Sequence, residues 1–478
     1  MQQATDLLEL SLCEAAALVK SRAVSPVELV EAVLARIHAV DGRLHAYITV
    51  FEAQARQVAR AAELMIAAGH DLGPLHGVPL AIKDNIAVKG FRTTAGSKIL
   101  GDAVSTEDAT VAARLRQAGA IFVGKLNMHE FAWGGTSANP HFGTVANPWN
   151  TARFSAGSSG GSGAAVAARM CFGALGTDTG GSIRLPAAVN GVTGIRPTYG
   201  RVSNHGIVPL AWSMDTAGPL ARSAADCALL FDAIAGPDRL DPTTCEDDGF
   251  RQRWRDQQAD VGGLRIGVIP GYFDRHLQPA VQGAVAAALR TLVQMGARLF
   301  EIDVPIIKHN IAAQLTVEAA EPSTYHQRWL HRRPDDYGDD VRALLEAGAL
   351  LPATHYLQAQ RYRSALRRDF LAAFDRVDVF VCPTLPFTAT PLGATTVAIE
   401  DGVEEDMLAA IMRFTGIPSL TGLPAISVPC GFDGDGLPIG MQIIGRPMSE
   451  SFLFGVAAAY QQSTGFHLRA PLLQAQAA

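Results

Sequence analysis

The segment Phe154–Pro197 is the part of the chain that most restricts its fold. It contains two glycine- and serine-rich turns, Gly157–Gly163 and Gly180–Ser182. Between them lie an alanine-rich run, Ala164–Met170, and a short apolar run, Cys171–Leu175. An alanine-rich run favours a helix, and a short apolar run bounded by glycine favours a buried strand. The segment therefore predicts loop, helix, strand, loop and helix, with a serine at the start of each helix.

These turns suit nucleophilic chemistry, because glycines let the backbone turn tightly and aim N–H groups at one point. A serine hydroxyl there can attack a carbonyl whose developing oxyanion the N–H groups hold. Three alternatives compete. A flexible linker would not be flanked by apolar helix and strand patterns. A P-loop needs a lysine after its glycines, and a nucleophile elbow at Ser159 would need a strand before it. None of the three accounts for a second serine in a second glycine turn.

Composition narrows the class of protein. The chain has 478 residues, 48% of them hydrophobic, and a net charge of −6. This suits a large α/β core and provides no basic stripe, so we expect no nucleic-acid partner. The first twenty residues have no continuous apolar run, and no stretch elsewhere is long enough to span a membrane. Six cysteines are scattered without C-x-x-C pairs, as in a reducing compartment. We therefore expect a cytoplasmic protein without membrane association.

The N-terminal part predicts a helical lead-in over about residues 1–70. Ser25 is a predicted N-cap, followed by proline and then by Glu28 three residues after the cap, which is a capping box. The helix that it opens runs from Pro26 to about Ala39 with an apolar face, and a second helix is expected over Glu52–Ala68. The following apolar run, Val78–Ile82, predicts a buried strand that ends at Lys83.

The rest of the chain alternates between apolar strands and helices, which predicts a sheet covered on both faces. We expect a single large α/β/α sandwich with a mixed, mostly parallel central sheet. Tyr199–Leu220 is rich in glycine and proline and predicts a loop, and Ile306–Asp375 predicts helices separated by Pro305, Pro322, Pro334 and Pro352. The other expected helices are Thr110–Gly119, Ser223–Ala235, Pro279–Met295 and Glu450–Gln462. The other expected strands are Ala120–Gly124, Arg265–Ile269, Arg298–Ile302, Val377–Val381, Ala425–Val428 and Ile439–Ile444.

Three sequence blocks resemble the amidase signature family of serine hydrolases. They are Gly157-Ser158-Ser159-Gly160-Gly161-Ser162, then Asp178-Thr179-Gly180-Gly181-Ser182-Ile183-Arg184, and upstream Gly77-Val78-Pro79-Leu80-Ala81-Ile82-Lys83-Asp84-Asn85. The spacing between the first two blocks is that of the family, and the resemblance extends from about Ser25 to about Pro447. It implies one domain over residues 1–478, with a catalytic core over 71–235. It also implies a variable helical region over about 303–376 that covers the substrate entrance.

The resemblance implies a Ser-cisSer-Lys triad that needs no metal or cofactor. Ser182 would be the nucleophile, and Lys83 would be the base, acting through the Ser158 hydroxyl as a proton shuttle. The peptide bond between Gly157 and Ser158 would be cis. To act as a base, Lys83 must be neutral, so its pKa must fall by roughly two to three units from about 10.4. Asp84 and Asn85 directly follow Lys83 and are expected to order it.

Further residues have expected roles around this triad. Backbone N–H groups would form an oxyanion hole, and three side chains would support the loops or simply cap them. Trp133 and Gly134 would line the substrate pocket, with a core position as the alternative for Trp133. His129 and Glu130 suggest a metal site, but adjacent residues point apart and no H-E-x-x-H motif completes it. The oxyanion-hole residues are Thr179, Gly180 and Gly181, and the supporting residues are Ser159, Asp178 and Arg184.

The resemblance gives a substrate class with alternatives. We expect hydrolysis of a C–N bond in a small aryl or alkyl amide, with carbamate, urethane or ester turnover as variants. The alternatives are the glutamine-hydrolysing subunit of a tRNA-dependent amidotransferase and a ureide hydrolase of the biuret or allophanate type. Arg363 matches the arginine that this subunit uses for the glutamine carboxylate. The acidic residue that the subunit carries further on is absent, since Met412, Arg413 and Phe414 occupy that region. The expected partners are a small-molecule amide and, as in many such enzymes, a second copy of the chain.

Overall fold

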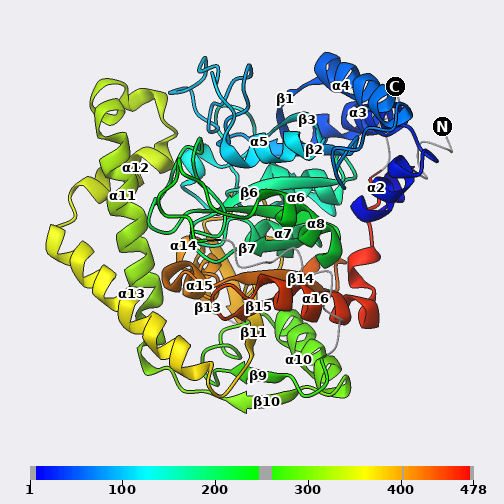
Figure 1. Ribbon diagram of the computed structural model, residues 1–478. Coiled ribbons are helices and arrows are strands. Elements are labelled where there is room, and N and C mark those ends of the chain that lie inside the picture. Colours follow the sequence, from blue (N-terminus) through cyan, green and yellow to red (C-terminus); the bar gives the residue numbers. More distant parts are fainter. Residues whose placement is uncertain (1–6, 247–260, 401–402, 474–478) are drawn as a thin grey trace.

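A computed structural model describes residues 7–246, 261–400 and 403–473 (Figure 1). Among these residues, eleven strands form one central sheet. Their order across the sheet is β1 (Tyr47–Val50), β3 (Ile121–Leu126), β2 (Pro79–Lys83), β6 (Gly173–Asp178), β8 (Thr216–Ala221), β7 (Thr193–Arg196), β14 (Ala425–Phe432), β15 (Pro438–Gly445), β11 (Val379–Pro383), β9 (Arg265–Val268) and β10 (Arg298–Glu301).

The sheet is mixed, as predicted. Parallel pairing joins β3, β2 and β6 in one block and β11, β9 and β10 in another. The strands between these blocks pair antiparallel, because β14 and β15 form a hairpin and β8 runs back between β6 and β7. The two parallel blocks carry the α/β pattern that the sequence predicts, while the centre of the sheet departs from it.

Strand β8 was not predicted, because all of it except Ala221 lies within Tyr199–Leu220, which we expected to be a loop. Its sequence contains Gly218 and Pro219, both residue types that are rare in strands. The strand forms because it pairs with β6 over its whole length and with β7 at its end. Tertiary pairing therefore outweighs local propensity at this position.

Helices cover both faces of the sheet. Gly173 of β6 faces Leu230 of α8 (Ala224–Ile234). Gly176, three positions further along β6, faces Ser159 and Ile183 at the starts of α6 (Gly160–Ala167) and α7 (Arg184–Asn190). Because strand side chains alternate between faces, α6 and α7 lie on one face and α8 on the other. Helix α16 (Glu450–Thr464) packs beside α8, which completes the predicted α/β/α sandwich.

The two ends of the sheet carry different helices. Helices α2 (Leu12–Lys20), α3 (Pro26–Leu44) and α4 (Glu52–Ala67) lie at the β1 end, and α10 (Pro279–Gln294) lies at the β10 end (Figure 1). The capping box at Ser25 is confirmed, since its side chain and that of Glu28 each bond the other's backbone N–H. The remaining elements are α5 (Thr110–Gln117), β4 (Ala146–Asn147), β5 (Asn150–Phe154), β12 (Thr396–Glu400), β13 (Val403–Asp406), α14 (Met407–Ile411), α15 (Gly416–Thr421) and four short 3₁₀ helices, Glu130–Ala132, Pro305–His309, Pro334–Asp336 and Phe466–Leu468.

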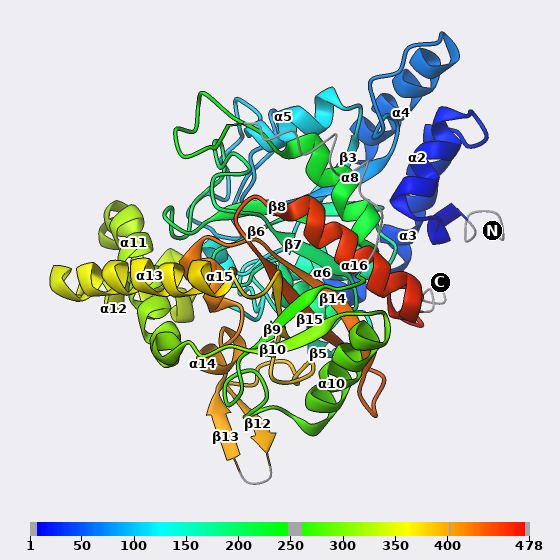
Figure 2. The ribbon, with the colours of Figure 1, turned by 60° about the horizontal axis from the view of Figure 1, so that its bottom comes forward.

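Three helices form a layer beside the sheet (Figures 1 and 2). They are α11 (Asn310–Arg332), α12 (Asp339–Ala349) and α13 (Ala353–Ala373). Pro305 and Pro334 begin short 3₁₀ helices and Pro352 precedes α13, as predicted. The prediction that Pro322 breaks the helix is wrong, because α11 continues through it. The contacts of α11 with α12 and α13 keep this helix intact despite the missing N–H. In the part of the chain that the structure describes, none of the helices has the length and apolar character needed to span a membrane.

Candidate active site

Lys83 and Ser158 lie in direct contact at one edge of the sheet. Strands β2 and β6 are parallel, so their carboxyl ends bring Lys83 and Thr177 to the same edge. The Nζ of Lys83 donates a hydrogen bond to Ser158 Oγ at 2.7 Å and another to Thr177 Oγ1 at 2.8 Å. The peptide bond between Gly157 and Ser158 is cis, which confirms the prediction.

The electrostatic setting of Lys83 favours its neutral form. Complete burial lowers the pKa of Lys83 to about 7, although the charges of Asp178 and Asp215 act in the opposite direction. An ammonium group loses its hydration when it is buried, so the neutral amine is favoured. A substantial fraction of Lys83 is therefore unprotonated at neutral pH and can accept a proton from the adjacent hydroxyl.

The residues that order Lys83 differ in part from those expected. The carboxylate of Asp84 turns away and forms a buried ion pair with Lys125 at 3.0 Å. Asn85 acts through an intermediate, since its Nδ2 donates to Thr177 Oγ1 at 3.2 Å. Thr177, which was not predicted, is thus the side chain that links Asn85 to Lys83. Its only sequence signal is its place before the Asp178–Arg184 block, at the end of an apolar strand.

Asp178 anchors the second glycine turn, Gly180–Ser182, through hydrogen bonds in the protein interior. Its two carboxylate oxygens accept a pair of hydrogen bonds from Arg184, at 3.0 and 2.9 Å, and one from Arg196 at 3.1 Å. The backbone N–H groups of Gly181 and Ile183 also donate to this carboxylate. Burial alone would raise the pKa of Asp178, but the two guanidinium groups and the N–H donors hold it well below its usual range. Asp178 and Arg184 thus fix the loop on either side of Ser182.

We predict that Asp178→Ala destabilises the fold strongly. The substitution leaves two fully buried arginines without their shared carboxylate, and breaking such a buried pair costs about 3–5 kcal/mol. Asp435→Ala is the control, because Asp435 forms an exposed pair with Arg153 at 3.7 Å and should change stability by less than about 1 kcal/mol. Urea unfolding measures both variants. Equal and small losses of stability would contradict the structural role of Asp178.

The predicted oxyanion donors have different environments. The N–H of Gly181 already donates to Asp178 Oδ1 at 3.0 Å, so this group is bonded within the protein. The side chain of Thr179 donates to Asp215 at 2.6 Å, which leaves its backbone N–H as the predicted donor. Gly180 lines the same cavity as Ser182, and its carbonyl is held by Thr415 Oγ1 at 2.7 Å. Gly180 and Thr179 therefore remain predicted donors, whereas Gly181 acts in holding the turn.

Ser182 opens into a small cavity, here called the inner cavity, of about 20 Å³. The glycine turn that contains Ser182 is joined to the one that contains Ser158, since the Ser159 N–H donates to the carbonyl of Ser182 at 3.2 Å. The side chain of Ser159 accepts from and donates to the backbone of Thr177, which anchors α6 to β6. The inner cavity is lined by Ala132, Trp133, Gly134, Gly135, Gly157, Gly180, Ser182, Leu185, Leu210, Glu318, Leu408 and Met412.

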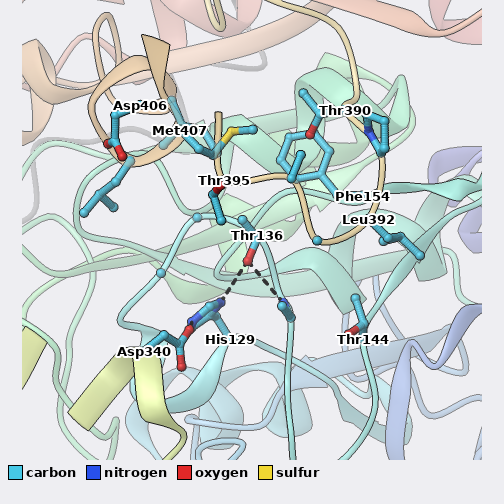
Figure 3. Close-up of a pocket in the computed structure, with 18 of the residues that line it drawn as sticks. His129, Thr136, Thr144, Phe154, Asp340, Thr390, Leu392, Thr395, Asp406 and Met407 are labelled. Atoms are coloured by element: carbon cyan, nitrogen blue, oxygen red, sulfur yellow. Dashed lines mark hydrogen bonds and ion pairs between the residues drawn. The ribbon is translucent and has the colours of Figure 1, made fainter. Parts of the chain in front are cut away.

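A larger pocket of about 330 Å³, here called the outer pocket, adjoins the inner cavity (Figure 3). The two share Trp133, Gly134, Gly135 and Leu408 as lining residues. The sequence prediction that Trp133 and Gly134 line a pocket beside the nucleophile therefore agrees with their positions. Trp133 is also buried, as the alternative core position requires, and its contact with substrate stays a prediction. The opposite wall of the outer pocket comes from residues 390–395 and 406–411 (Figure 3).

His129 and Glu130 point to different partners, as expected for adjacent residues. His129 Nε2 lies 3.0 Å from the carboxylate of Asp340 at the start of α12, at the wall of the outer pocket (Figure 3). Glu130 accepts from His141 and from Ser97 within the core. Asp340 could not be found from the sequence, because α12 is far from His129 in the chain and its contacts with the core depend on the fold.

Arg363 is held by protein atoms. Its guanidinium donates to the backbone carbonyl of Leu420 at 3.1 Å and to the hydroxyl and carbonyl of Ser213 at 2.8 and 3.0 Å. It lines neither the inner cavity nor the outer pocket. Met412, one of the three residues in the region where the amidotransferase subunit carries its acidic residue, does line the inner cavity. Arg363 and Met412 therefore offer no charged group to a glutamine molecule in either pocket.

Comparisons with known proteins agree with this architecture. The family model described as Amidase matches residues 28–454. The chain is 41% identical over 474 residues to a Glutamyl-tRNA(Gln) amidotransferase subunit from Thermosynechococcus vestitus, in a match that covers 94% of this chain and 97% of the relative. A chain from a solved structure, described as a vestigial protein complex that reveals the evolutionary origins of an s-triazine catabolic enzyme, is 36% identical, with a TM-score of 0.90 over 95% of this chain and 99% of that one. A bacterial aryl acylamidase is 28% identical, with a TM-score of 0.87 over 97% and 99% of the two chains.

Proposed function

Because the chain belongs to the amidase family and is a hydrolase of C–N bonds, we propose that it cleaves a small uncharged amide through an acyl-enzyme on Ser182. The observation that carries this proposal is the 2.7 Å hydrogen bond between Lys83 Nζ and Ser158 Oγ, at a lysine whose pKa lies near 7. A general base must lie within hydrogen-bond reach of the proton it takes and have a pKa near the working pH. Lys83 meets both conditions.

The reaction proceeds in two halves. Lys83 takes the Ser158 proton while Ser158 takes that of Ser182, and Ser182 Oγ bonds to the amide carbon. The backbone N–H groups of Thr179 and Gly180 stabilise the oxyanion, at roughly 3–4 kcal/mol for each donor. The C–N bond then breaks, the relay returns a proton to the leaving amine, and an acyl ester remains on Ser182. Water attacks this ester by the same relay, which releases the carboxylic acid and restores the serine.

The lining of the two pockets supports an uncharged, mainly apolar substrate. Leu185, Leu210, Leu408 and Met412 surround the reacting position, and a pocket of about 330 Å³ is at the small end of ligand sites. A short alkyl or aryl amide fits such a site, and so does the corresponding carbamate or ester. The region 303–376, which contains α11 to α13, would cover the entrance and select the substrate.

The second candidate is the glutamine-hydrolysing subunit of a tRNA-dependent amidotransferase. The name of the relative from Thermosynechococcus vestitus, 41% identical over nearly the full length of both chains, favours it. In that case the partners would be further protein subunits and a charged tRNA. Against it stand the guanidinium of Arg363, which is engaged by protein atoms, and the neutral Met412, because neither offers a charge to the α-carboxylate or α-ammonium group of glutamine.

A panel of substrates separates these candidates. Ammonia or amine release is measured with the purified chain alone on glutamine, butyramide, butyranilide, a phenyl carbamate and biuret. The proposal expects turnover of the uncharged amides, including the anilide, and none of glutamine. Turnover of glutamine alone would favour the amidotransferase candidate, and turnover of biuret alone would favour a ureide hydrolase. Either of the last two results would overturn the proposal.

The pH dependence of the reaction should report Lys83. Because the neutral amine is the active form, we predict that kcat/KM rises as the pH increases through about 7. Below that pH the rate should fall about tenfold for each pH unit, since the unprotonated fraction falls by the same factor. Initial rates with butyranilide between about pH 5.5 and pH 8 measure this limb. A rate that is constant over this range would contradict Lys83 as the base.

A further inference from the structure

Glu318 is a buried acid beside Ser182 that the mechanism above does not use. Its side chain, on α11, is 2% exposed and lines the inner cavity together with Ser182 and Gly180. Its neighbour one turn earlier, Gln314, donates from Nε2 to Glu318 Oε1 at 3.0 Å. Gln314 Nε2 also lies 3.1 Å from the Sδ of Met412, so the carboxyl group is fixed against two walls of the cavity.

The carboxyl group lies directly against the turn that carries Ser182. A Cβ atom placed on Gly180 would stand 2.5 Å from Glu318 Oε1 and 2.2 Å from Gln314 Nε2. A side chain at this position would therefore push the ends of Gln314 and Glu318 out of place. Glu318 therefore faces the site at which the scissile carbonyl must lie for Ser182 to attack it.

The surroundings of Glu318 favour its neutral form. Burial raises the pKa of Glu318 to about 8, and the charges of Asp215 and Asp178 add to this effect. The hydrogen bond from Gln314 and the charge of Arg196 act in the opposite direction and are weaker than burial. Glu321, one turn further along α11, is bonded to Ser213 and Tyr356. At neutral pH, Glu318 is therefore mainly a carboxylic acid.

Hydrogen-bond chemistry determines where the proton of this acid lies. An amide NH₂ group only donates, so Glu318 Oε1 accepts from Gln314. The acidic proton then sits on Oε2. Among the described residues, the carboxyl group of Glu318 accepts this hydrogen bond from Gln314. Because Glu318 lines the inner cavity, an acceptor on a bound substrate can take the hydrogen bond of this proton.

We propose that Glu318 is a specificity-determining residue that donates a hydrogen bond from its neutral carboxyl group to a second carbonyl oxygen of the substrate, next to the scissile amide. This inference rests on the proposed amidase function and narrows its substrate class to uncharged amides with a neighbouring carbonyl. An ionised Glu318 would lose this hydrogen bond and would repel the negative charge that develops on the oxyanion. The enzyme should therefore lose activity on such substrates as the pH rises above about 8.

The test compares acetoacetanilide, which has a second carbonyl, with butyranilide, which does not. The parent protein is expected to prefer acetoacetanilide by roughly tenfold in kcat/KM, as for one good hydrogen bond. Glu318→Leu should remove this preference. Glu318→Gln keeps an N–H donor, so it should retain the preference with kcat/KM lowered by about two- to fivefold.

The pH profile provides the second readout. With the parent protein, kcat/KM for acetoacetanilide should fall by about fifteenfold between pH 8 and about pH 9.5, because the acid is half ionised at the first pH and almost fully ionised at the second. Glu318→Gln should abolish this falling limb. Glu321→Gln, a change of another buried acid on the same helix, should retain it.

The outcomes are distinct. A parent protein that hydrolyses neither anilide would overturn the proposed function and the inference with it. Turnover of both anilides without preference would overturn the inference alone. So would a Glu318→Leu variant that retains the preference, or a Glu318→Gln variant that retains the falling limb. Selective loss of activity on an α-amino acid amide in Glu318→Gln would instead identify an ionised Glu318 that binds an ammonium group.

Discussion

Replacing Ser182 with alanine is expected to lower kcat/KM by about 10⁴-fold or more, because no other nucleophile can form the acyl-enzyme. The cavity around Ser182 is lined by protein side chains that do not depend on its hydroxyl, so the variant should still fold. The measurement is amine release from butyranilide with the purified variant. Residual activity should come only from stabilisation of the oxyanion by the backbone and from substrate binding.

The matched control is Ser364→Ala. Ser364 is an exposed serine on α13 whose hydroxyl bonds only the carbonyl of Gln360 at 3.2 Å. Its replacement should leave activity within a factor of about two. If Ser182→Ala retained more than about a tenth of the parent activity, Ser182 would not be the nucleophile.

Replacing Lys83 with methionine is expected to lower kcat by about 10³- to 10⁴-fold, since the Ser158 hydroxyl loses the base that takes its proton. The remaining activity should no longer rise through pH 7, because the group that titrates there is gone. Kinetics of the parent and the variant over the same pH range give both quantities. A variant that keeps the parent pH profile would show that another group is the base.

The same substitution should not weaken the fold. The pKa of Lys83 is lower in the folded chain than in the unfolded chain, so the unfolded chain binds more protons between about pH 7 and pH 10.5. Lys83 therefore destabilises the fold most below pH 7, and this effect fades as the pH rises through that window. At pH 7, Lys83→Met should unfold at the same temperature as the parent or higher. Lys125→Met should instead destabilise, because it leaves the buried Asp84 without its partner.

The central features of the site could be predicted because they lie in compact sequence blocks. Lys83 ends an apolar strand, and Ser158 and Ser182 each stand in a glycine turn before a helix, so local patterns and the family resemblance located all three. Parallel pairing of β2 and β6 then brings Lys83 to Ser158, at 2.7 Å. The cis bond before Ser158 followed from the resemblance alone.

Other residues of the site could not be predicted, because their places depend on contacts between distant segments. Glu318 and Asp340 belong to helices α11 and α12, where the sequence shows only alternating charge and apolar residues. Which of their acids face the core depends on how these helices pack against the sheet. Arg363 shows the converse, since its motif matched a substrate-binding arginine while the fold directs its guanidinium to Ser213 and Leu420.

Contacts between distant segments also determined the parts of the fold that could not be predicted. Strand β8 contains glycine and proline and forms only because β6 and β7 pair with it on both sides. Pro322 lies within a helix because α12 and α13 pack along that helix. In both places the local sequence favours an interruption, and tertiary contacts that the sequence does not display outweigh it.

Labelling with an alkyl fluorophosphonate tests the central claim most directly, since this reagent reacts with serines that a base activates. Trypsin would separate the two serines, because residues 154–169 contain Ser158 and residues 170–184 contain Ser182 as their only serine. We expect one label per chain, on the peptide 170–184, at a rate that rises through about pH 7 and vanishes in Lys83→Met. A label on the peptide 154–169, or labelling that persists in Ser182→Ala, would contradict Ser182 as the nucleophile.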